Sequence, residues 1–320
     1  MTPRPASETL TAMTVRPGSV PAILRTLTLG SADWETRGVL RPQTQPQRTP
    51  ARFPPADDLS AFVDLYWIAR WDLAPGETTV VETLPHPCVN VVVEPGRSRV
   101  HGPVKGRFSR TLAGRGRVVS ARLRPGAFRV LSGRPAWRLV DVSIDFPAAF
   151  GVASGPLESA MLGHADDQAA DQADEQADEQ AMIGHLEQFL RERLPAPDPT
   201  VLDCIDLVDR IVGRIAADRD IARVEDLAQA VSLGRRTLER LFREYVGPSP
   251  KWVIRQYRLQ AAADEAAKGR VANWSRLASD LGYADQAHFI RDFRAILGAT
   301  PTEFARQAAR PRPAQGRPAA

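Results

Sequence analysis

The stretch Arg240–Pro250 (RLFREYVGPSP) organises this chain, because the chain repeats it at Arg291–Pro301 (RDFRAILGATP). Both copies share the frame Arg-x-Phe-Arg-x-x-x-Gly-x-x-Pro, and the dipeptide Leu227-Ala228 upstream of the first copy recurs as Leu277-Ala278. A period of about fifty residues is typical of repeated structural units. Each copy predicts a short helix, a turn and a second helix with one apolar and one basic face, which is the pattern of a helix-turn-helix.

The first copy carries the signals that delimit its helices. Spacings of three and four residues predict one apolar stripe, formed by Leu238, Leu241, Phe242 and Tyr245. Gly247 follows as a stop signal, and Ser249-Pro250 supplies an N-cap and a first-turn proline for the next helix. That helix runs from Lys251 to about Lys268 and connects the two halves.

The second copy repeats this logic. Asp285 is placed to cap a helix in which Phe289, Phe293 and Ile296 face inward. The run Thr300-Pro301-Thr302-Glu303 predicts a capping box that opens a last short helix. A single basic helix is as well explained by a solvated surface as by a ligand. Two helices with the same basic frame, each preceded by a short Leu-Ala helix, favour binding to DNA.

The charge of the chain is unevenly spread. The 320 residues carry a net charge of +4, but residues 221–310 hold 15 Lys/Arg and 10 Asp/Glu, which gives +5. Residues 161–200 hold 2 Lys/Arg and 10 Asp/Glu, which gives −8. A basic module after an acidic segment presents a surface that attracts phosphates.

The remaining composition excludes several protein classes. Only Cys88 and Cys204 are present, so a disulfide framework is not expected and a reducing compartment fits. The N-terminus lacks the apolar core of a signal peptide, and no apolar run approaches the ~20 residues of a membrane span. We therefore expect a cytoplasmic protein without a membrane partner.

Residues 56–160 predict a β-rich domain that follows a flexible leader over residues 1–55. Short runs rich in Val and aromatic residues are separated by turn dipeptides such as Pro75-Gly76 and Pro125-Gly126. In the run 117–124, Val119, Ala121 and Leu123 alternate with more polar positions, as in a strand with one buried face. Several short strands at this spacing indicate a barrel or a sandwich.

One group of residues in this domain invites a different interpretation. His86, Cys88 and His101, with Glu82 nearby, could bind a metal or perform chemistry. The alternative is a turn between strands in which Cys88 is a small buried residue. No close Cys pair or His-x-His spacing supports the metal, so we expect no metal, no cofactor and no catalytic residue. An enzyme or metal-binding protein that uses this group, with the helices as an appendage, remains the alternative function.

Residues 161–200 predict an acidic low-complexity linker, because the run DQAADQADEQADEQA permits a helix but offers no apolar face. After it, apolar residues recur at spacings of four and three. They are Val201, Ile205, Val208, Val212 and Ile215. This seam spans only about two heptads, so it fits a helix packed on the following domain or a dimer interface.

The C-terminal part of the sequence resembles the AraC/XylS family of bacterial transcription regulators over residues 205–306. The most specific segment is LASDLGYADQAHFIRDFRAILGATPTEF, and TLERLFREYVGPSPKWV also matches. The sequence departs from the family at Gly234, where Ser commonly caps the recognition helix; Gly caps at little loss. The segment around VETLPHPCVNVVVEPG resembles a sensor-type domain fused to this module in related regulators.

The resemblance implies one chain that inserts two recognition helices into successive major grooves, roughly 34 Å apart. By position it implies four DNA contacts in each helix. They are Arg235, Arg236, Glu239 and Arg240 in the first, and Gln286, Ala287, His288 and Arg291 in the second. Arg240 and Arg291 are equivalent in the repeat and are the strongest candidates. Ala287 could contact only a thymine methyl, and His288 is either a contact or a buried, hydrogen-bonded ring.

The sequence thus predicts an α+β protein. Its β-rich domain, cupin-like, barrel or sandwich, would sense an effector or dimerise, and residues 201–308 would form an all-α tandem helix-turn-helix DNA-binding domain before a flexible tail at 309–320. The predicted function is sequence-specific binding of double-stranded DNA in transcription regulation. Compatible partners are RNA polymerase, a small-molecule effector that no residue identifies, and a second copy of the chain. A second rival is a DNA binder without sequence preference.

Overall fold

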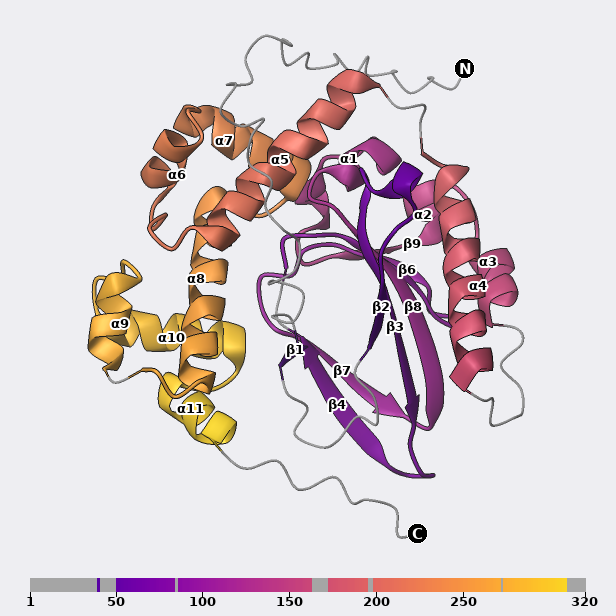
Figure 1. The fold of residues 1–320 in the computed structure, drawn as a ribbon, viewed down its shortest axis with the longest axis horizontal. Helices are drawn as coiled ribbons and strands as arrows, with labels where there is room; N and C mark the ends of the chain where they lie inside the picture. The colour runs from indigo at the N-terminus through magenta and orange to yellow at the C-terminus, as the bar shows by residue number, and fades with distance from the viewer. Residues whose placement is uncertain are drawn as a thin grey trace, which may run out of the picture.

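The computed structural model describes residues 39–40, 50–83, 86–162, 172–194, 198–271 and 273–309. Within these ranges, strands predominate up to residue 145 and helices follow to residue 309. The predicted order of a β-rich domain and an all-α domain is therefore confirmed, and Figure 1 shows the two side by side. Most of the expected leader and nearly all of the expected tail lie outside the described residues.

The described strands of the N-terminal domain form two antiparallel sheets. The larger has the order β2 (Ala51–Phe53), β3 (Val63–Asp72), β8 (Arg115–Leu123), β5 (Asn90–Val93), β6 (Arg99–His101) and β9 (Ser143–Asp145). The smaller has the order β1 (Val39–Leu40), β4 (Thr78–Thr83) and β7 (Phe108–Ala113). Val119, Ala121 and Leu123 are buried as predicted, but Val118 and Ser120 are buried too. Strand β8 is therefore covered on both faces and not on one.

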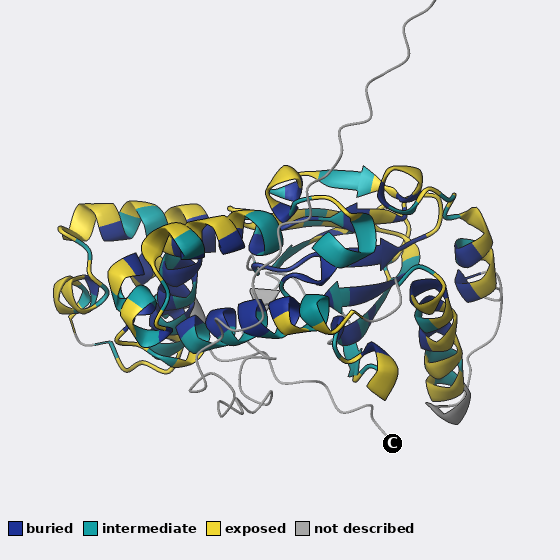
Figure 2. Cartoon of the chain, turned by 90° about the horizontal axis from the view of Figure 1, so that it is seen from above, coloured by how far each residue is buried: buried dark blue, intermediate teal, exposed yellow. Residues whose placement is uncertain are grey.

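Short helices surround these sheets. They are η2 (Asp57–Leu59), α1 (Ala127–Ser132), η3 (Ala136–Leu139), α2 (Phe146–Phe150) and α3 (Gly155–Leu162). Figure 1 shows α3 on the side of the sheets that faces away from the C-terminal helices, while Figure 2 shows that buried positions concentrate where the helices meet the strands. The side chains of Phe128 and Phe146, 1% and 0% exposed, belong to the hydrophobic core of this domain.

The acidic segment differs from the predicted linker, because its described part is a helix docked on the N-terminal domain. Helix α4 (Gln172–Arg191) buries five apolar side chains in the core, namely Met182, Ile183, Leu186, Phe189 and Leu190. Its acidic residues meet arginines of the sheet: Arg70 lies 2.9 Å from Glu175 and 3.1 Å from Asp178, and Arg117 lies 2.6 Å from Asp178. The acidic residues of α4 thus form ion pairs with arginines of the sheet, and our expectation of a solvated spacer was wrong.

Helix α5 (Pro199–Ala217) belongs to both domains. Ile205, near its start, is part of the N-terminal core, whereas Val208, Val212 and Ile215 belong to the core of the first helix-turn-helix. The predicted apolar seam therefore packs inside the chain, which agrees with the packed-helix interpretation. Because α5 contributes side chains to both cores, it joins the two domains as a shared helix.

The remaining helices follow the predicted repeat. The first half contains α6 (Val224–Ala230), α7 (Arg235–Leu241) and the π-helical segment η4 (Phe242–Val246). Helix α8 (Pro250–Ala267) connects it to the second half, which contains α9 (Trp274–Asp280), α10 (Gln286–Leu297) and α11 (Pro301–Ala309). Each half has its own hydrophobic cluster, and α8 contributes Val253 to the first and Leu259 to the second.

The two copies of the repeated frame differ at their glycines. Gly247 has φ 100° and its N–H donates to the carbonyl of Phe242, five residues back, at 2.6 Å. Gly298 has φ 79° and caps α10 with an ordinary bond to Arg294 at 2.8 Å. At Gly247, a Cβ atom would lie 2.9 Å from Val140 Cγ2 and 3.0 Å from the carbonyl oxygen of Ala136. The first copy is therefore distorted where η3 of the N-terminal domain packs against it.

Because of this difference, we expect substitution of the two glycines to lower the free energy of unfolding by different amounts. We expect Gly247→Ala to lower the free energy of unfolding by at least about 2 kcal/mol, since the positive φ and the backbone contact act together. Gly298→Ala should cost about 1 kcal/mol, because its close neighbour is the flexible end of the Arg107 side chain, which can move away. Urea denaturation followed by circular dichroism measures both. Equal losses would contradict the role of the η3 contact.

Candidate nucleic-acid interface

Helix α7 presents its polar residues to solvent because its apolar stripe is buried. Leu238 and Phe242 are 0% exposed and Leu241 is 3% exposed, as the spacing predicted, while Tyr245 is half-buried. The helix begins after Gly234, whose backbone is extended and supplies no side-chain cap. The four predicted contact residues, Arg235, Arg236, Glu239 and Arg240, are all exposed.

Two of these four residues are bonded to each other. The Nε of Arg235 lies 2.9 Å from Glu239, and its Nη1 lies 2.8 Å from Glu225 of α6. Exposed ion pairs of this kind contribute little to stability, so an arriving phosphate or base can replace them at small cost. Arg240 has no ion-pair partner among the described residues, so its guanidinium is available to a ligand.

Helix α10 is set in place by a side-chain cap. The Oδ1 of Asp285 accepts the N–H of His288 at 2.7 Å, as the sequence predicted. Phe289 and Phe293 are 0% exposed and Ile296 is 3% exposed. This burial leaves Gln286, Ala287, His288 and Arg291 exposed on the opposite face.

The polar residues of α10 are held by neighbours to different degrees. Ser275 of α9 donates a hydrogen bond to Oε1 of Gln286 at 2.7 Å. The ring of His288 packs edge-on against Tyr283 at 5.2 Å and its Nε2 lies 3.4 Å from Asp292, which also pairs with Arg255 of α8. His288 is thus an exposed ring and not a buried one. Arg291, like Arg240, has no ion-pair partner in the described ranges.

The candidate interface therefore consists of two separate surfaces, which correspond to each other in the sequence repeat. Figure 1 shows α8 running between the α6–α7 pair and the α9–α10 pair. Each surface combines hydrogen-bonding side chains with an arginine, Arg240 or Arg291, that stands at the same place in the frame and has no ion-pair partner among the described residues. Such an arrangement suits a long, regularly repeating polyanion better than a compact small molecule.

The two remaining frame arginines differ in their surroundings. Arg294 is exposed on α10, whereas the guanidinium of Arg243 stacks on Trp137 of η3, 4.9 Å from the ring centroid. Arg129 of α1 also approaches Glu244 at 3.7 Å. Sequence reasoning missed this contact between the N-terminal domain and the first helix-turn-helix, because no local pattern links η3 to η4.

The group His86, Cys88 and His101 does not come together as a metal site. His101 lies on β6 against Phe108, with ring centroids 6.0 Å apart, while Cys88 accepts a weak contact from Asn90 at 3.9 Å. Burial raises the pKa of Cys88 to about 11 and lowers the pKa of His86 to about 3, so both are neutral. A protonated thiol is a poor nucleophile and a poor ligand. In the described part of the chain, no three His, Cys, Asp or Glu residues are grouped to hold a metal ion.

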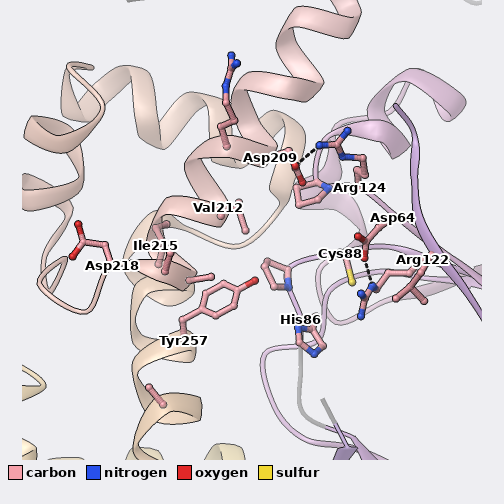
Figure 3. A pocket seen from close by; sticks show the side chains of 18 of the residues that line it. Asp64, His86, Cys88, Arg122, Arg124, Asp209, Val212, Ile215, Asp218 and Tyr257 are labelled. Atoms are coloured by element: carbon pink, nitrogen blue, oxygen red, sulfur yellow. Dashed lines mark hydrogen bonds and ion pairs between the residues drawn. The ribbon is translucent and has the colours of Figure 1, made fainter. Parts of the chain in front are cut away.

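His86 and Cys88 instead line a cleft of about 1300 Å³ between the two domains, shown in Figure 3. Tyr257 of α8 faces them across it. The sequence placed Tyr257 on the connecting helix without a role, since only the packing of α8 against the N-terminal domain brings it there. None of the helices in the described ranges combines the length and the apolar character needed to cross a membrane.

Comparisons with known proteins give two family matches. Residues 227–307 match a helix-turn-helix domain model, and residues 51–145 match a domain of unknown function, DUF6597. No curated protein matches the chain.

Among solved structures, a probable AraC family transcriptional regulator from Rhodopseudomonas palustris aligns with 25% identity and a TM-score of 0.29, covering 32% of this chain and 97% of its own. ToxT from Vibrio cholerae, bound to (E)-4-(8-methylnaphthalen-1-yl)but-3-enoic acid, aligns with 12% identity and a TM-score of 0.36, covering 82% and 98%. ToxT in another crystal form aligns with 13% identity and a TM-score of 0.33, covering 80% and 96%. With TM-scores below 0.5, these alignments carry no argument about ligands or the arrangement of domains.

Proposed function

We propose that the chain is a DNA-binding transcriptional regulator of the AraC type, which reads an asymmetric site with α7 and α10 in successive major grooves; its residues 227–307 match a helix-turn-helix domain. The observation that carries this proposal is the pair Arg240 and Arg291. Both are exposed, both lack an ion-pair partner among the described residues, and both occupy the same place in the repeated frame. An unpaired arginine on an exposed helix can donate two hydrogen bonds to O6 and N7 of guanine.

The other candidate residues have graded roles in this proposal. Gln286 can form a pair of hydrogen bonds with adenine, and Ala287 can contact a thymine methyl. Arg235 and Arg236 hold phosphates and fix the register. Because α10 offers fewer hydrogen-bonding groups at its start than α7, the second half-site should be read less strictly.

The N-terminal domain is the regulatory part in this proposal. It contacts the first helix-turn-helix, which is the first DNA reader of this proposal, through Trp137 and Arg243. Helix α5 contributes side chains to the cores of both. A ligand or a second copy that changes this contact would alter DNA affinity only if it binds the two arrangements differently. RNA polymerase is the partner through which the bound protein would act, in the cytoplasm. AraC-type regulators are generally not enzymes, and the proposal includes no catalytic activity.

The test of this function is selection of bound genomic DNA fragments by the purified full-length protein. The proposal expects a compact asymmetric motif with two half-sites about ten base pairs apart. Absence of any enriched motif, together with equal binding of selected and random DNA at moderate salt, would favour a binder without sequence preference and overturn the proposal.

A salt titration gives a second prediction about the frame arginines. Each lost phosphate contact should reduce the slope of log affinity against log salt concentration by about 0.9. We expect this change for Arg294→Ala, because Arg294 is exposed and available to a phosphate. Arg243→Ala should change the slope by less than half as much, because Trp137 already holds Arg243. Fluorescence anisotropy with labelled DNA measures both slopes, and equal reductions would contradict the distinction.

A further inference from the structure

The two helix-turn-helix units do not share a hydrophobic core. Leu238 and Phe242 belong to one buried cluster, whereas Phe289 and Phe293 belong to another. Helix α8 runs between the units and contributes side chains to both clusters (Figure 1). The position of α10 relative to α7 therefore depends on α8 and on the contacts that join the two units beside it.

Arg258 of α8 joins the two units through one guanidinium group. Its Nη2 donates to the carbonyl oxygen of Arg219 at 3.1 Å and to the carbonyl oxygen of Asp280 at 2.8 Å. Arg219 lies between α5 and α6 in the first unit, whereas Asp280 is the last residue of α9 in the second. Nε and Nη1 of Arg258 have no hydrogen-bond partner in the described ranges, so these two bonds are the ones that hold the side chain.

The surroundings of Arg258 favour a cation at this point. The side chain is 9% exposed, and the two carbonyl groups lie at or just beyond the C-terminal ends of α9 and α5, where partial negative charge gathers. Asp226 and Asp220 of the first unit also stabilise its charge. Hydrogen bonds from a charged donor are stronger than neutral ones, and the planar guanidinium fixes their directions. Arg258 thus holds the two units in a defined geometry.

A second close approach lies beside this bridge. Gly282 follows α9, and a Cβ atom added there would lie 3.6 Å from Cβ of Ala222 and 3.7 Å from Nη1 of Arg258. Ala222 belongs to the first unit, where its backbone N–H donates to Asp226 at 3.0 Å. A larger side chain at position 222 would therefore press against the second unit without removing either bond of Arg258.

We propose that Arg258 is a positioning residue that sets the distance and the rotation between α7 and α10, and thereby makes the protein selective for one separation of its two half-sites. The proposal rests on the proposed function and adds to it a specificity determinant that contacts no base. One turn of DNA spans about 34 Å in about ten base pairs, so each added base pair moves the second half-site by about 3.4 Å and rotates it by roughly 35°. Two recognition helices in a fixed arrangement cannot follow both changes.

The experiment measures binding of the full-length protein to labelled duplexes that differ in the separation of the selected half-sites. One duplex has the selected separation, one is a base pair shorter and one is a base pair longer; two others carry a single half-site each. We expect the unaltered protein to prefer its own separation by about tenfold or more. Arg258→Met keeps the apolar stem of the side chain but removes both bonds. It should reduce this preference below about threefold and leave the affinity for each single half-site within about twofold.

Arg270→Met provides the matched control. Arg270 is exposed and pairs with Glu265 of α8 at 2.9 Å, so its removal takes away the same charge and leaves the bridge intact. The preference for one separation should not change. Arg258→Lys should restore part of the preference, because an ammonium group can still donate to both carbonyl oxygens. Ala222→Leu should change the preference among the three separations by about threefold or more, although Arg258 is present.

The outcomes separate positioning from simple stability. The proposal is overturned if the unaltered protein binds all three separations equally, or if folded Arg258→Met keeps the full preference. It is also overturned if this variant weakens binding to the single half-sites as much as to the complete site. Should Arg258→Met lack the circular dichroism of the folded protein, Ala222→Leu decides, and an unchanged preference in that variant counts against the bridge. Failure of the proposed function would appear separately, as unaltered protein that binds neither single half-site better than random DNA.

Discussion

Arg240→Ala will weaken binding to the selected DNA site by roughly ten- to a hundredfold and will relax base preference in one half-site only. Arg291→Ala will produce the same kind of loss in the other half-site. The reason is that each guanidinium is exposed and has no ion-pair partner in the described ranges. Its removal should therefore cost contacts with bases without leaving a carboxylate of the protein unpaired. Repeating the selection of bound fragments with both variants measures the loss and its position.

A matched substitution in the N-terminal domain separates base reading from net charge. Arg97 is exposed in the turn between β5 and β6, and Arg97→Ala removes the same charge. It should leave the motif intact and change affinity by less than twofold. If Arg240→Ala and Arg291→Ala weakened binding to all sequences alike, which is the effect expected from loss of charge alone, the proposal of two base-reading helices would be wrong.

Phe293→Ala will lower the free energy of unfolding of the second helix-turn-helix by about 3 to 5 kcal/mol, the usual cost of emptying a buried aromatic site. Phe293 is 0% exposed and packs edge-on against Phe289 at 5.5 Å and Phe304 at 5.8 Å. Because this cluster is separate from the others, we expect urea denaturation to show a new early transition while the N-terminal domain keeps its midpoint. Protection of the second half-site in footprinting should be lost with it.

The equivalent change in the first copy should behave differently. Phe242 is also 0% exposed, but its cluster includes α5, which continues into the N-terminal core. Phe242→Ala should therefore shift the main transition and create no separate one. Phe108→Ala serves as the control, since Phe108 is 37% exposed and has less burial to lose. A single shared transition for both buried variants would show that the two clusters unfold together.

The repeat made most of the C-terminal domain predictable. Strict spacing of apolar residues identified the buried faces of α7 and α10, and that burial dictated which polar residues are exposed. The caps at Ser249 and Asp285 were also readable, because an N-cap is a local interaction within a few residues. Whether the eight exposed candidates contact DNA remains a prediction for the experiments above.

The features that the sequence did not reveal depend on distant partners. Helix α4 docks through its five buried apolar side chains and through ion pairs of its acidic residues with Arg70 and Arg117, far earlier in the chain. Its apolar stripe lies after the low-complexity run, at spacings that a longer window would have included. Likewise, the π-helical form of η4 arises where η3 packs on Gly247, and the same frame forms a regular helix end at Gly298.

The shared helix α5 limits how this protein can be taken apart or recombined. A chimera that joins the helix-turn-helix domain to a different N-terminal domain could not have its junction within residues 199–217. In such a chimera Ile205 would no longer meet the N-terminal core that it packs in, while Val212 would still have to pack in the core of the first helix-turn-helix. Only a junction that exchanges α5 together with the surface of α1 would preserve both, since a Cβ atom added at Gly126, beside α1, would lie 3.5 Å from Cα of Ile205. Exchange of the N-terminal domain would therefore require matched changes on both sides of this helix, so we expect the two domains to be exchangeable only together.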